Sequence, residues 1–262
     1  MQPIRTVAAT RYITPLREGG SLPAIVEADD GRLYVLKFRG AGQGRKALIA
    51  ELVAGELGRA LGLPIPELVF VELDEAFSRS EPHEEIQDLM RASTGLNLAL
   101  AYLPGALAFE PLLAPPGTLA LASAIVWFDA YTMNVDRTAR NSNMLVAGGQ
   151  LWLIDHGAAL YIHHTWANWR ERSHGRFPQV KDHMLLRYAD ALPQADALLS
   201  ARLSRDLVRE VAARIPDSWL EGEPHFADLA EHRAAYVEYL CGRLESPRAF
   251  AEEALHARAQ LV

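Results

Sequence analysis

The 262-residue sequence is poor in cysteine, in lysine and in long apolar runs. Cys241 is the only cysteine, which excludes an intramolecular disulfide and a zinc site built from several cysteines, and which indicates a reducing compartment. The start of the chain has no apolar signal core, and the longest apolar stretch, Leu119 to Phe128, is too short to span a bilayer. We therefore expect a cytoplasmic protein with no membrane partner.

Positive charge is also scarce, because 26 basic residues face 33 acidic ones and leave a net charge of −7. That balance argues against a nucleic-acid binder, which needs a basic surface. Half of the residues are hydrophobic, so a chain of this length buries a sizeable core without a disulfide or metal. Only Lys37, Lys46 and Lys181 are lysines, and each is a candidate for a site that needs a compact ammonium group.

The first third of the chain has the apolar alternation and turn residues of β-strands. A helix follows the third strand, and Gly62 and Pro64 are typical of its end. The polar segment from Ser78 to Asp88 is expected to be a solvated loop or short helix. The predicted elements are strands at Val7–Ile13, Pro23–Glu27, Leu33–Phe38, Leu68–Leu73 and Leu96–Leu103, and a helix at Arg45–Leu61.

The remainder is predicted to be mainly helical, with helices at Leu119–Tyr131, Leu198–Ile215 and Phe226–Leu244 and a short hairpin between Asn141 and Asp155. The expected fold class is α+β with two lobes. Residues 1–102 would form an antiparallel sheet with one helix, and residues 103–262 a helical lobe that carries the catalytic loop and metal site. A cleft between two lobes is a common place for a small ligand.

The strongest chemical signal is the hairpin that ends in Ile154-Asp155-His156-Gly157. Gly148-Gly149 is a two-residue turn that pairs Ala147 with Gln150 and, further out, Ser142 with Asp155. The open end of the hairpin would therefore bring Asn141 beside Asp155. An amide oxygen and a carboxylate without a Cys or His cluster suit a hard cation such as Mg²⁺.

Asp136 lies five residues before Asn141 and could serve the same cavity as a base or as a group that orients a nucleophile. Metal, phosphates and one oriented hydroxyl are what phosphoryl transfer requires. The alternative is an Asx-rich loop capped by its own side chains, with Asp155 only ending a strand.

Lys37, on the predicted third strand, could reach nucleotide phosphates while a helical glutamate orients it. Otherwise it is a solvated edge residue. Glu51 is the predicted partner and Glu56 its rival, because five helical steps turn the direction by roughly 140° and both cannot face one ammonium. The alternative for Glu51 is a surface ion on a solvated helix face.

The order of the candidate residues along the chain resembles that of the eukaryotic-like protein kinase fold. That order is Lys37, the helix with Glu51, the loop from Asp136 to Asn141, and Asp155-His156-Gly157. Three short motifs are similar to those of the small stand-alone HipA-family kinases. They are Asn134-Val135-Asp136-Arg137, Ile154-Asp155-His156-Gly157 and Leu61-Gly62-Leu63-Pro64-Ile65-Pro66. The resemblance runs from Thr10 to about Leu186 and implies a two-lobed protein kinase-like fold, with ATP and Mg²⁺ as cofactors.

The resemblance also implies a role for each matching residue: Lys37 on the α- and β-phosphates, Glu51 paired with Lys37, Asp136 as catalytic base, Asn141 and Asp155 on Mg²⁺, and Tyr102 and Leu103 as the hinge against adenine. Two departures put the activation switch of ordinary kinases in doubt. Asn134 stands where a typical kinase has the His of H-R-D, and His156 replaces the Phe of D-F-G.

The loop from Arg17 to Ser21 occupies the phosphate-covering position, where Gly19 and Gly20 would let backbone N–H groups approach an anion. An ordinary hairpin loop explains it equally well. HipA-like kinases phosphorylate a serine in this loop, so Ser21 is a hypothetical autophosphorylation site.

The leading interpretation is an ATP- and Mg²⁺-dependent kinase that acts on Ser or Thr of a protein whose identity is open. A small-molecule kinase of the same fold and a nucleotide-binding pseudokinase are the alternatives. The chain is shorter than the HipA toxins, and nothing in the sequence supports an antitoxin partner. A metal site at His163-His164 is disfavoured, because adjacent histidines point in different directions on most backbones.

Overall fold

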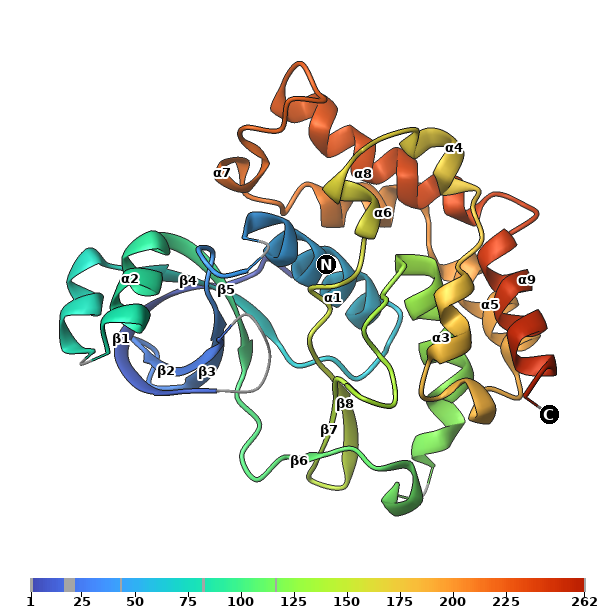
Figure 1. Ribbon diagram of the computed structural model, residues 1–262, viewed down its shortest axis with the longest axis horizontal. Coiled ribbons are helices and arrows are strands. Elements are labelled where there is room, and N and C mark those ends of the chain that lie inside the picture. Colours follow the sequence, from blue (N-terminus) through green and yellow to red (C-terminus); the bar gives the residue numbers. More distant parts are fainter. Residues whose placement is uncertain (1, 17–21, 43, 82, 116, 262) are drawn as a thin grey trace.

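The computed structural model describes residues 2–16, 22–42, 44–81, 83–115 and 117–261 (Figure 1). Its strands are β1 (Thr6–Pro15), β2 (Ala24–Ala28), β3 (Leu33–Lys37), β4 (Leu68–Leu73), β5 (Gly95–Ala101), β6 (Leu107–Ala108), β7 (Met144–Ala147) and β8 (Gln150–Leu153). Its α-helices are α1 (Arg45–Ala60), α2 (Glu84–Ala92), α3 (Ala122–Thr132), α4 (Trp169–Ser173), α5 (Leu192–Arg202), α6 (Arg205–Ala212), α7 (Asp217–Leu220), α8 (Leu229–Leu244) and α9 (Ala249–Ala259).

The first five strands close into a barrel in the order β1-β2-β3-β5-β4. The expectation of a wholly antiparallel sheet is wrong, because β1 pairs with β4 in parallel, with Thr6 opposite Phe70. The ten-residue β1 is long enough to pair at its start with β4 and further along with β2, in antiparallel register. Hydrophobic alternation marks a strand but not the direction of its neighbour, so the sequence did not reveal this closure.

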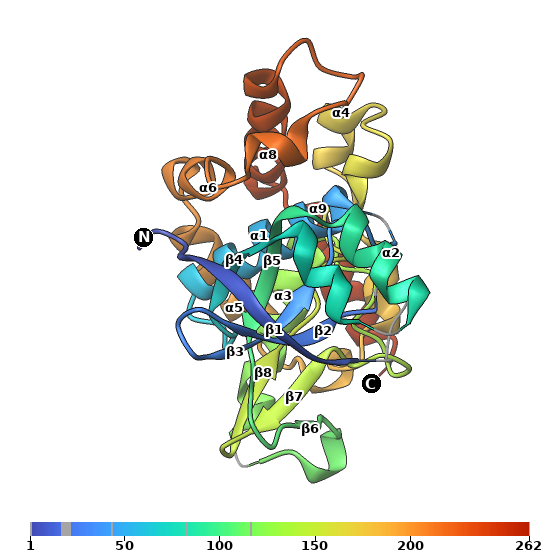
Figure 2. The ribbon, with the colours of Figure 1, turned by 90° about the vertical axis from the view of Figure 1, so that its left-hand side faces the viewer.

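A second helix, α2, packs beside the barrel where the sequence left a loop or short helix open, so the expectation of one helix in this part is also wrong (Figure 2). The turn between β2 and β3 contains Asp29, Asp30 and Gly31. Gly31 has φ of +73°, and the main-chain N–H of Arg32 donates to Asp30 at 3.1 Å. This turn delivers β3, and with it Lys37, to the side of the barrel that faces α1.

Helix α1 lies between the barrel and the helices from α3 onward (Figure 1). It contacts β4 and β5 on one side and α6 and α7 on the other. Its residues from Leu48 to Gly58 are all buried, and its apolar side chains belong to the large core that includes α3 and the C-terminal helices. A Cβ at Gly58 would clash with the side chain of Ile65 and meet the ring of Phe128 at 3.2 Å, so glycine leaves room for the two side chains that pack on α1 at this point.

The β7-β8 hairpin has the predicted turn and register, because Gly148 and Gly149 have φ of +58° and +76° and Ala147 pairs with Gln150. The predicted helix from Leu198 to Ile215 is divided instead. Ser204 caps α6 by accepting the N–H of Leu207 at 3.1 Å, which ends one helix and starts another. In the described part of the chain, the helices are all too short or too polar to cross a membrane.

Candidate active site

Lys37 is held between two carboxylates that come from distant parts of the chain. Its Nζ donates to Oε2 of Glu51 and to Oδ1 of Asp155, both at 2.5 Å. We call these three residues the Lys37 cluster. The side chain of Lys37 is 12% exposed, Glu51 is fully buried and Asp155 is 42% exposed, so the cluster opens to solvent on the Asp155 side.

Burial alone would raise the pKa of Glu51, but Lys37 and a hydrogen bond with His156 lower it to about 2. Burial alone would lower the pKa of Lys37, but Glu51 and Asp155 raise it above its usual value. The ammonium and the Glu51 carboxylate are therefore both charged at neutral pH. An ammonium has three N–H donors, and the two carboxylates use two of them, which leaves one for a ligand.

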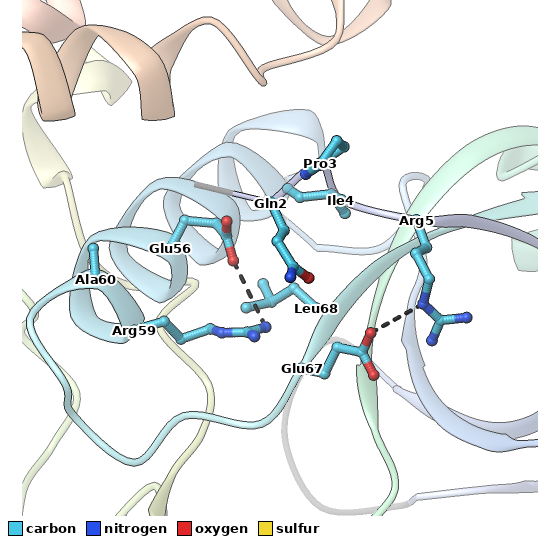
Figure 3. Close-up of a pocket in the computed structure, with 9 residues that line it drawn as sticks. All are labelled: Gln2, Pro3, Ile4, Arg5, Glu56, Arg59, Ala60, Glu67 and Leu68. Carbon is cyan, nitrogen blue, oxygen red and sulfur yellow. Dashed lines mark hydrogen bonds and ion pairs between the residues drawn. The ribbon is translucent and has the colours of Figure 1, made fainter.

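Glu56, the rival partner for Lys37, faces a different side of α1. Its carboxylate pairs with Arg214, just after α6, and lies 3.7 Å from Arg59 (Figure 3). Glu51 accepts the main-chain N–H of His156 at 2.8 Å in addition to Lys37. The structure thus assigns the Lys37 pair to Glu51 and gives Glu56 to the C-terminal helices.

Figure 3 also shows a hollow of about 420 Å³ between the N-terminal segment, the end of α1 and the start of β4. Ion pairs line it, with Arg5 3.0 Å from Glu67 on one side and Arg59 beside Glu56 on the other. Its lining includes no residue of the Lys37 cluster. This hollow is therefore separate from the predicted nucleotide site.

Asp155 reaches Lys37 because its backbone takes a left-handed turn directly after β8, with φ of +54°. Aspartate tolerates this conformation better than most residues. Just before it, the N–H of Ile154 donates to the carbonyl of Asn143 at 3.0 Å, which extends the hairpin ladder by one step. The hairpin register thereby sets where the Asp155 carboxylate lies.

Asp136 and Asn141 lie together, as the sequence predicted, through a 2.8 Å hydrogen bond from Nδ2 of Asn141 to Oδ2 of Asp136. Asn143, which sequence reasoning missed, joins this pair to Asp155. Its Nδ2 lies 3.4 Å from Oδ2 of Asp136 and 3.5 Å from the carbonyl of Asp155. Asn143 thus contacts both Asp136 and Asp155, whereas the hydrogen bond of Asn141 is with Asp136.

The loop that carries Asp136 is folded around the buried carboxylate of Asp129 on α3. Arg137 donates its Nε to Asp129 at 2.5 Å and its Nη1 to the carbonyl of Asn143. Nδ2 of Asn134 donates to Oδ1 of Asp129 at 3.1 Å, and Nε2 of His183 lies 3.0 Å from Oδ2 of Asp129. We call these residues, Asp129, Asn134, Arg137 and His183, the Asp129 cluster.

Burial alone would raise the pKa of Asp129, but Arg137 and His183 hold it well below its usual value. The carboxylate is therefore ionised and fully paired inside the protein. The sequence contains a signal for this site, because Asp129 is the one charged residue in the apolar run from Leu119 to Tyr131. An ionised side chain inside a buried helix requires a partner.

The expected hinge residues, Tyr102 and Leu103, follow β5 directly, and both are half-buried. The N–H of Tyr102 donates to the carbonyl of Leu33 at 3.0 Å and is therefore already used by β3. Gly19, Gly20 and Ser21, expected to cover the phosphates, lie outside the described residues.

The His163-His164 pair packs against aromatic rings. Nδ1 of the buried His163 lies 3.1 Å from the hydroxyl of Tyr236, and the two imidazole rings meet edge to face at 4.7 Å. Across the described ranges, no three His, Cys, Asp or Glu side chains gather to hold a metal ion by themselves.

The donor set at Asn141 and Asp155 nevertheless fits a cation that binds together with phosphates. Because Nδ2 of Asn141 faces Asp136, its carbonyl oxygen is turned away from that carboxylate. A half-exposed carboxylate and one amide oxygen leave the other positions to phosphate and water, which is the usual environment of Mg²⁺ in proteins. A zinc or copper cage would favour nitrogen or sulfur ligands instead.

Comparisons with known proteins place this geometry in context. The family model described as HipA-like kinase matches residues 10–252. Among solved structures, the proinflammatory kinase CtkA of Helicobacter pylori superposes with a TM-score of 0.57 at 12% identity and covers 99% of both chains. The Golgi casein kinase superposes with a TM-score of 0.50 at 12% identity, over 100% of this chain and 75% of that one. No match is found among curated protein sequences.

The two structural likenesses, at 12% identity, show a shared fold of mixed helices and strands. The family match is the broader result for function, because it spans most of the chain and includes the Lys37 cluster, the Asp129 cluster and Asp136.

Proposed function

The chain belongs to the HipA-like kinase family, and from that premise we propose that it transfers the γ-phosphoryl group of Mg-ATP to a serine or threonine hydroxyl of a protein. One observation carries the proposal: Lys37, Glu51 and Asp155 meet within hydrogen-bonding distance, although they come from a strand, a helix and a hairpin. An ion pair that only stabilises the fold needs one carboxylate for the ammonium, whereas here two carboxylates share the ammonium at a site that is open to solvent. An ammonium with one spare donor is suited to phosphate oxygens.

Lys37 would hold the α- and β-phosphates while Glu51 keeps the ammonium in place. Asp155 and Asn141 would supply the oxygen ligands of the cation. Bound Mg²⁺ would neutralise phosphate charge and orient the γ-phosphoryl group for in-line transfer. Asp155 is 42% exposed, so its carboxylate is accessible to such a cation.

Asp136 would accept a hydrogen bond from the acceptor hydroxyl and take its proton as the oxygen attacks the γ-phosphorus, while the bond from that phosphorus to the β-phosphate oxygen breaks and ADP leaves. Asn141 and Asn143 donate hydrogen bonds to Oδ2 of Asp136 and so fix the direction of the carboxylate. A base must lie within hydrogen-bonding reach of its proton, and a fixed carboxylate needs little reorganisation to do so.

We further propose the two-lobed division expected from the sequence, with residues 1–102 and 103–262 on either side of the nucleotide. The separate apolar cluster inside the barrel supports a distinct first lobe. Leu103 would provide the main-chain contact to adenine, since the N–H of Tyr102 is used by Leu33. The cytoplasm remains the proposed location, on the basis of the free and buried Cys241.

The test is to incubate the protein with γ-labelled ATP, Mg²⁺ and a cell lysate, and to separate labelled proteins from labelled small molecules. We expect label on protein Ser or Thr with the wild type and none with Asp136→Asn. Asp206→Asn is the matched control, because that carboxylate is 88% exposed and pairs only with Arg209 of its own helix among the described residues. Ser21→Ala separates self-labelling from transfer to other proteins.

Label on small molecules alone would replace the protein kinase with a small-molecule kinase. Equal labelling by the wild type and by Asp136→Asn would contradict the role of the Asp136 loop.

A further inference from the structure

Lys46, one of the three lysines of the chain, lies in the first turn of α1 and joins it to two other segments. Its Nζ donates to the carbonyl oxygen of His163 at 2.6 Å and forms an ion pair with Glu223 at 2.9 Å. His163 belongs to a short 3-10 helix (Tyr161–His164) that follows Asp155, and Glu223 precedes α8. One ammonium therefore ties together α1, the segment after Asp155 and the C-terminal helices.

The segment that Lys46 contacts is itself fixed. His163 is fully buried and lies 3.1 Å from the hydroxyl of Tyr236 on α8. The ring of Trp166 packs edge to face on Tyr236 and on His232, with centroids 4.9 and 5.6 Å apart. Lys46 thus holds α1 against an anchored piece of backbone rather than against a loose loop.

Further contacts hold α1 to the same helices. Arg45 donates to the carbonyl of Ser218 in α7 at 2.7 Å, and Glu56 pairs with Arg214, just after α6. Lys46 differs from both because it alone of these three contacts the chain that continues from Asp155. Glu51, in the middle of the same helix, contacts Lys37 and the N–H of His156. Two points on α1, Lys46 and Glu51, therefore set its position relative to Asp155.

We propose that Lys46 is a positioning residue that fixes α1 to the segment after Asp155, so that Glu51, Lys37 and Asp155 are aligned in the unmodified protein. The inference rests on the proposed function and extends it to regulation. All the parts of this restraint are ordinary side chains and main-chain carbonyls. The site therefore needs no phosphorylation of the segment after Asp155 to assemble.

A compact ammonium suits this position because it approaches one carbonyl oxygen and one carboxylate at once. The carboxylate of Glu223 is nearly buried, with 8% of its side chain exposed, and it also lies 2.6 Å from Nδ1 of His225. Removing the ammonium leaves a buried carbonyl and a carboxylate without this donor. The first turn of α1 should then loosen, and Glu51 should lose its alignment with Lys37.

The experiment measures kcat, the KM for Mg-ATP and hydrogen exchange of α1 in Lys46→Met, Lys46→Arg and Arg205→Met. Arg205 is the matched control, since it forms an exposed ion pair at 2.6 Å with Glu238 of α8. Lys46→Met should lower kcat about 10- to 100-fold, as small misplacements of catalytic groups do, with a smaller change in KM. Lys46→Arg should recover part of the loss, and Arg205→Met should match the wild type.

A purely structural role would lower stability without acting through Glu51, so the double variant Lys46→Met/Glu51→Gln decides between them. If Lys46 acts by aligning Glu51, the double variant has about the rate of Glu51→Gln alone. The proposal would be overturned if the fold-losses in kcat of the two single variants multiplied in the double variant. A kcat for Lys46→Met equal to that of the wild type would also overturn it.

Activation in the presence of ATP gives a further check. Wild-type protein treated with a phosphatase should start at full rate, whereas a lag removed by preincubation with Mg-ATP would contradict assembly without modification. If the wild type transfers no phosphate at all, the proposed function fails. Hydrogen exchange then still decides about Lys46, because α1 and residues 158–168 should exchange faster in Lys46→Met than in Arg205→Met only if the restraint exists.

Discussion

The Asp129 cluster and the Lys37 cluster each pair a carboxylate with a cation, and they differ in how far their charged groups are open to solvent. In the Asp129 cluster, the carboxylate and Arg137 are both fully buried, and the side chains of Arg137, Asn134 and His183 hold the carboxylate. In the Lys37 cluster, Asp155 is 42% exposed and the ammonium keeps a spare donor. The first cluster is closed to ligands and the second is open to them.

This difference distinguishes a cluster that stabilises the fold from a cluster that can bind ligands. A closed cluster presents no exposed group to a substrate, and two of its members, Asn134 and Arg137, lie in the loop that presents Asp136 and Asn143. An open cluster can exchange a protein partner for a phosphate or a cation. The same residue types, a carboxylate and a cation, thus stabilise the fold in one place and prepare a binding site in the other.

The largest expected effect on stability comes from breaking the closed cluster. Asp129→Asn would leave the buried guanidinium of Arg137 without its countercharge, which typically costs about 3–5 kcal/mol. Asp155→Asn should cost at most about 1 kcal/mol, because an exposed pair is weak. Urea unfolding of both variants at pH 7 measures the two losses. Equal losses would contradict the contrast between the clusters.

Acid should also destabilise the protein, by a somewhat smaller amount. Glu51 has a folded-state pKa of about 2 against an ordinary value of 4.5, and the pKa of Asp129 is likewise lowered. A lowered pKa contributes stability above the ordinary value that is lost as the pH falls through the folded value. Glu51 should therefore contribute roughly 3 kcal/mol that disappears between about pH 5 and pH 2.

Glu51→Gln sharpens this prediction, because it should flatten the dependence of unfolding free energy on pH in that window. The control Glu238→Gln removes an exposed carboxylate and should leave the slope unchanged. A slope in Glu51→Gln as steep as in the wild type would show that other groups cause the acid sensitivity.

Much of the open cluster could be predicted from sequence, since its residues belong to local patterns. The Gly148-Gly149 turn determines the hairpin register that places Asp155, and the arc of roughly 140° between Glu51 and Glu56 separates the two candidates for Lys37. The proline and glycine after α1 give its end to within a residue. Each of these inferences needs only residues that are close in the chain.

The closed cluster could not be predicted in the same way. Asp129 and His183 are 54 residues apart, and no periodicity links an aspartate in one helix to a histidine beyond the next hairpin. The parallel pairing of β1 with β4 was missed for the same reason, because it depends on how the barrel closes. Asn143 was overlooked because its neighbour Asn141 has the familiar spacing from Asp136.

Nucleotide affinity and turnover, measured together on the wild type, Asp136→Asn, Asp155→Asn and Lys37→Ala, test the central claim most directly. We predict that Asp136→Asn binds Mg-ATP about as tightly as the wild type in calorimetric titration but transfers phosphate at least about 100-fold more slowly. Asp155→Asn should lose the gain in ATP affinity that Mg²⁺ provides, and Lys37→Ala should weaken both binding and transfer. Wild-type turnover in Asp136→Asn, or unchanged Mg-ATP affinity in Asp155→Asn, would contradict the account.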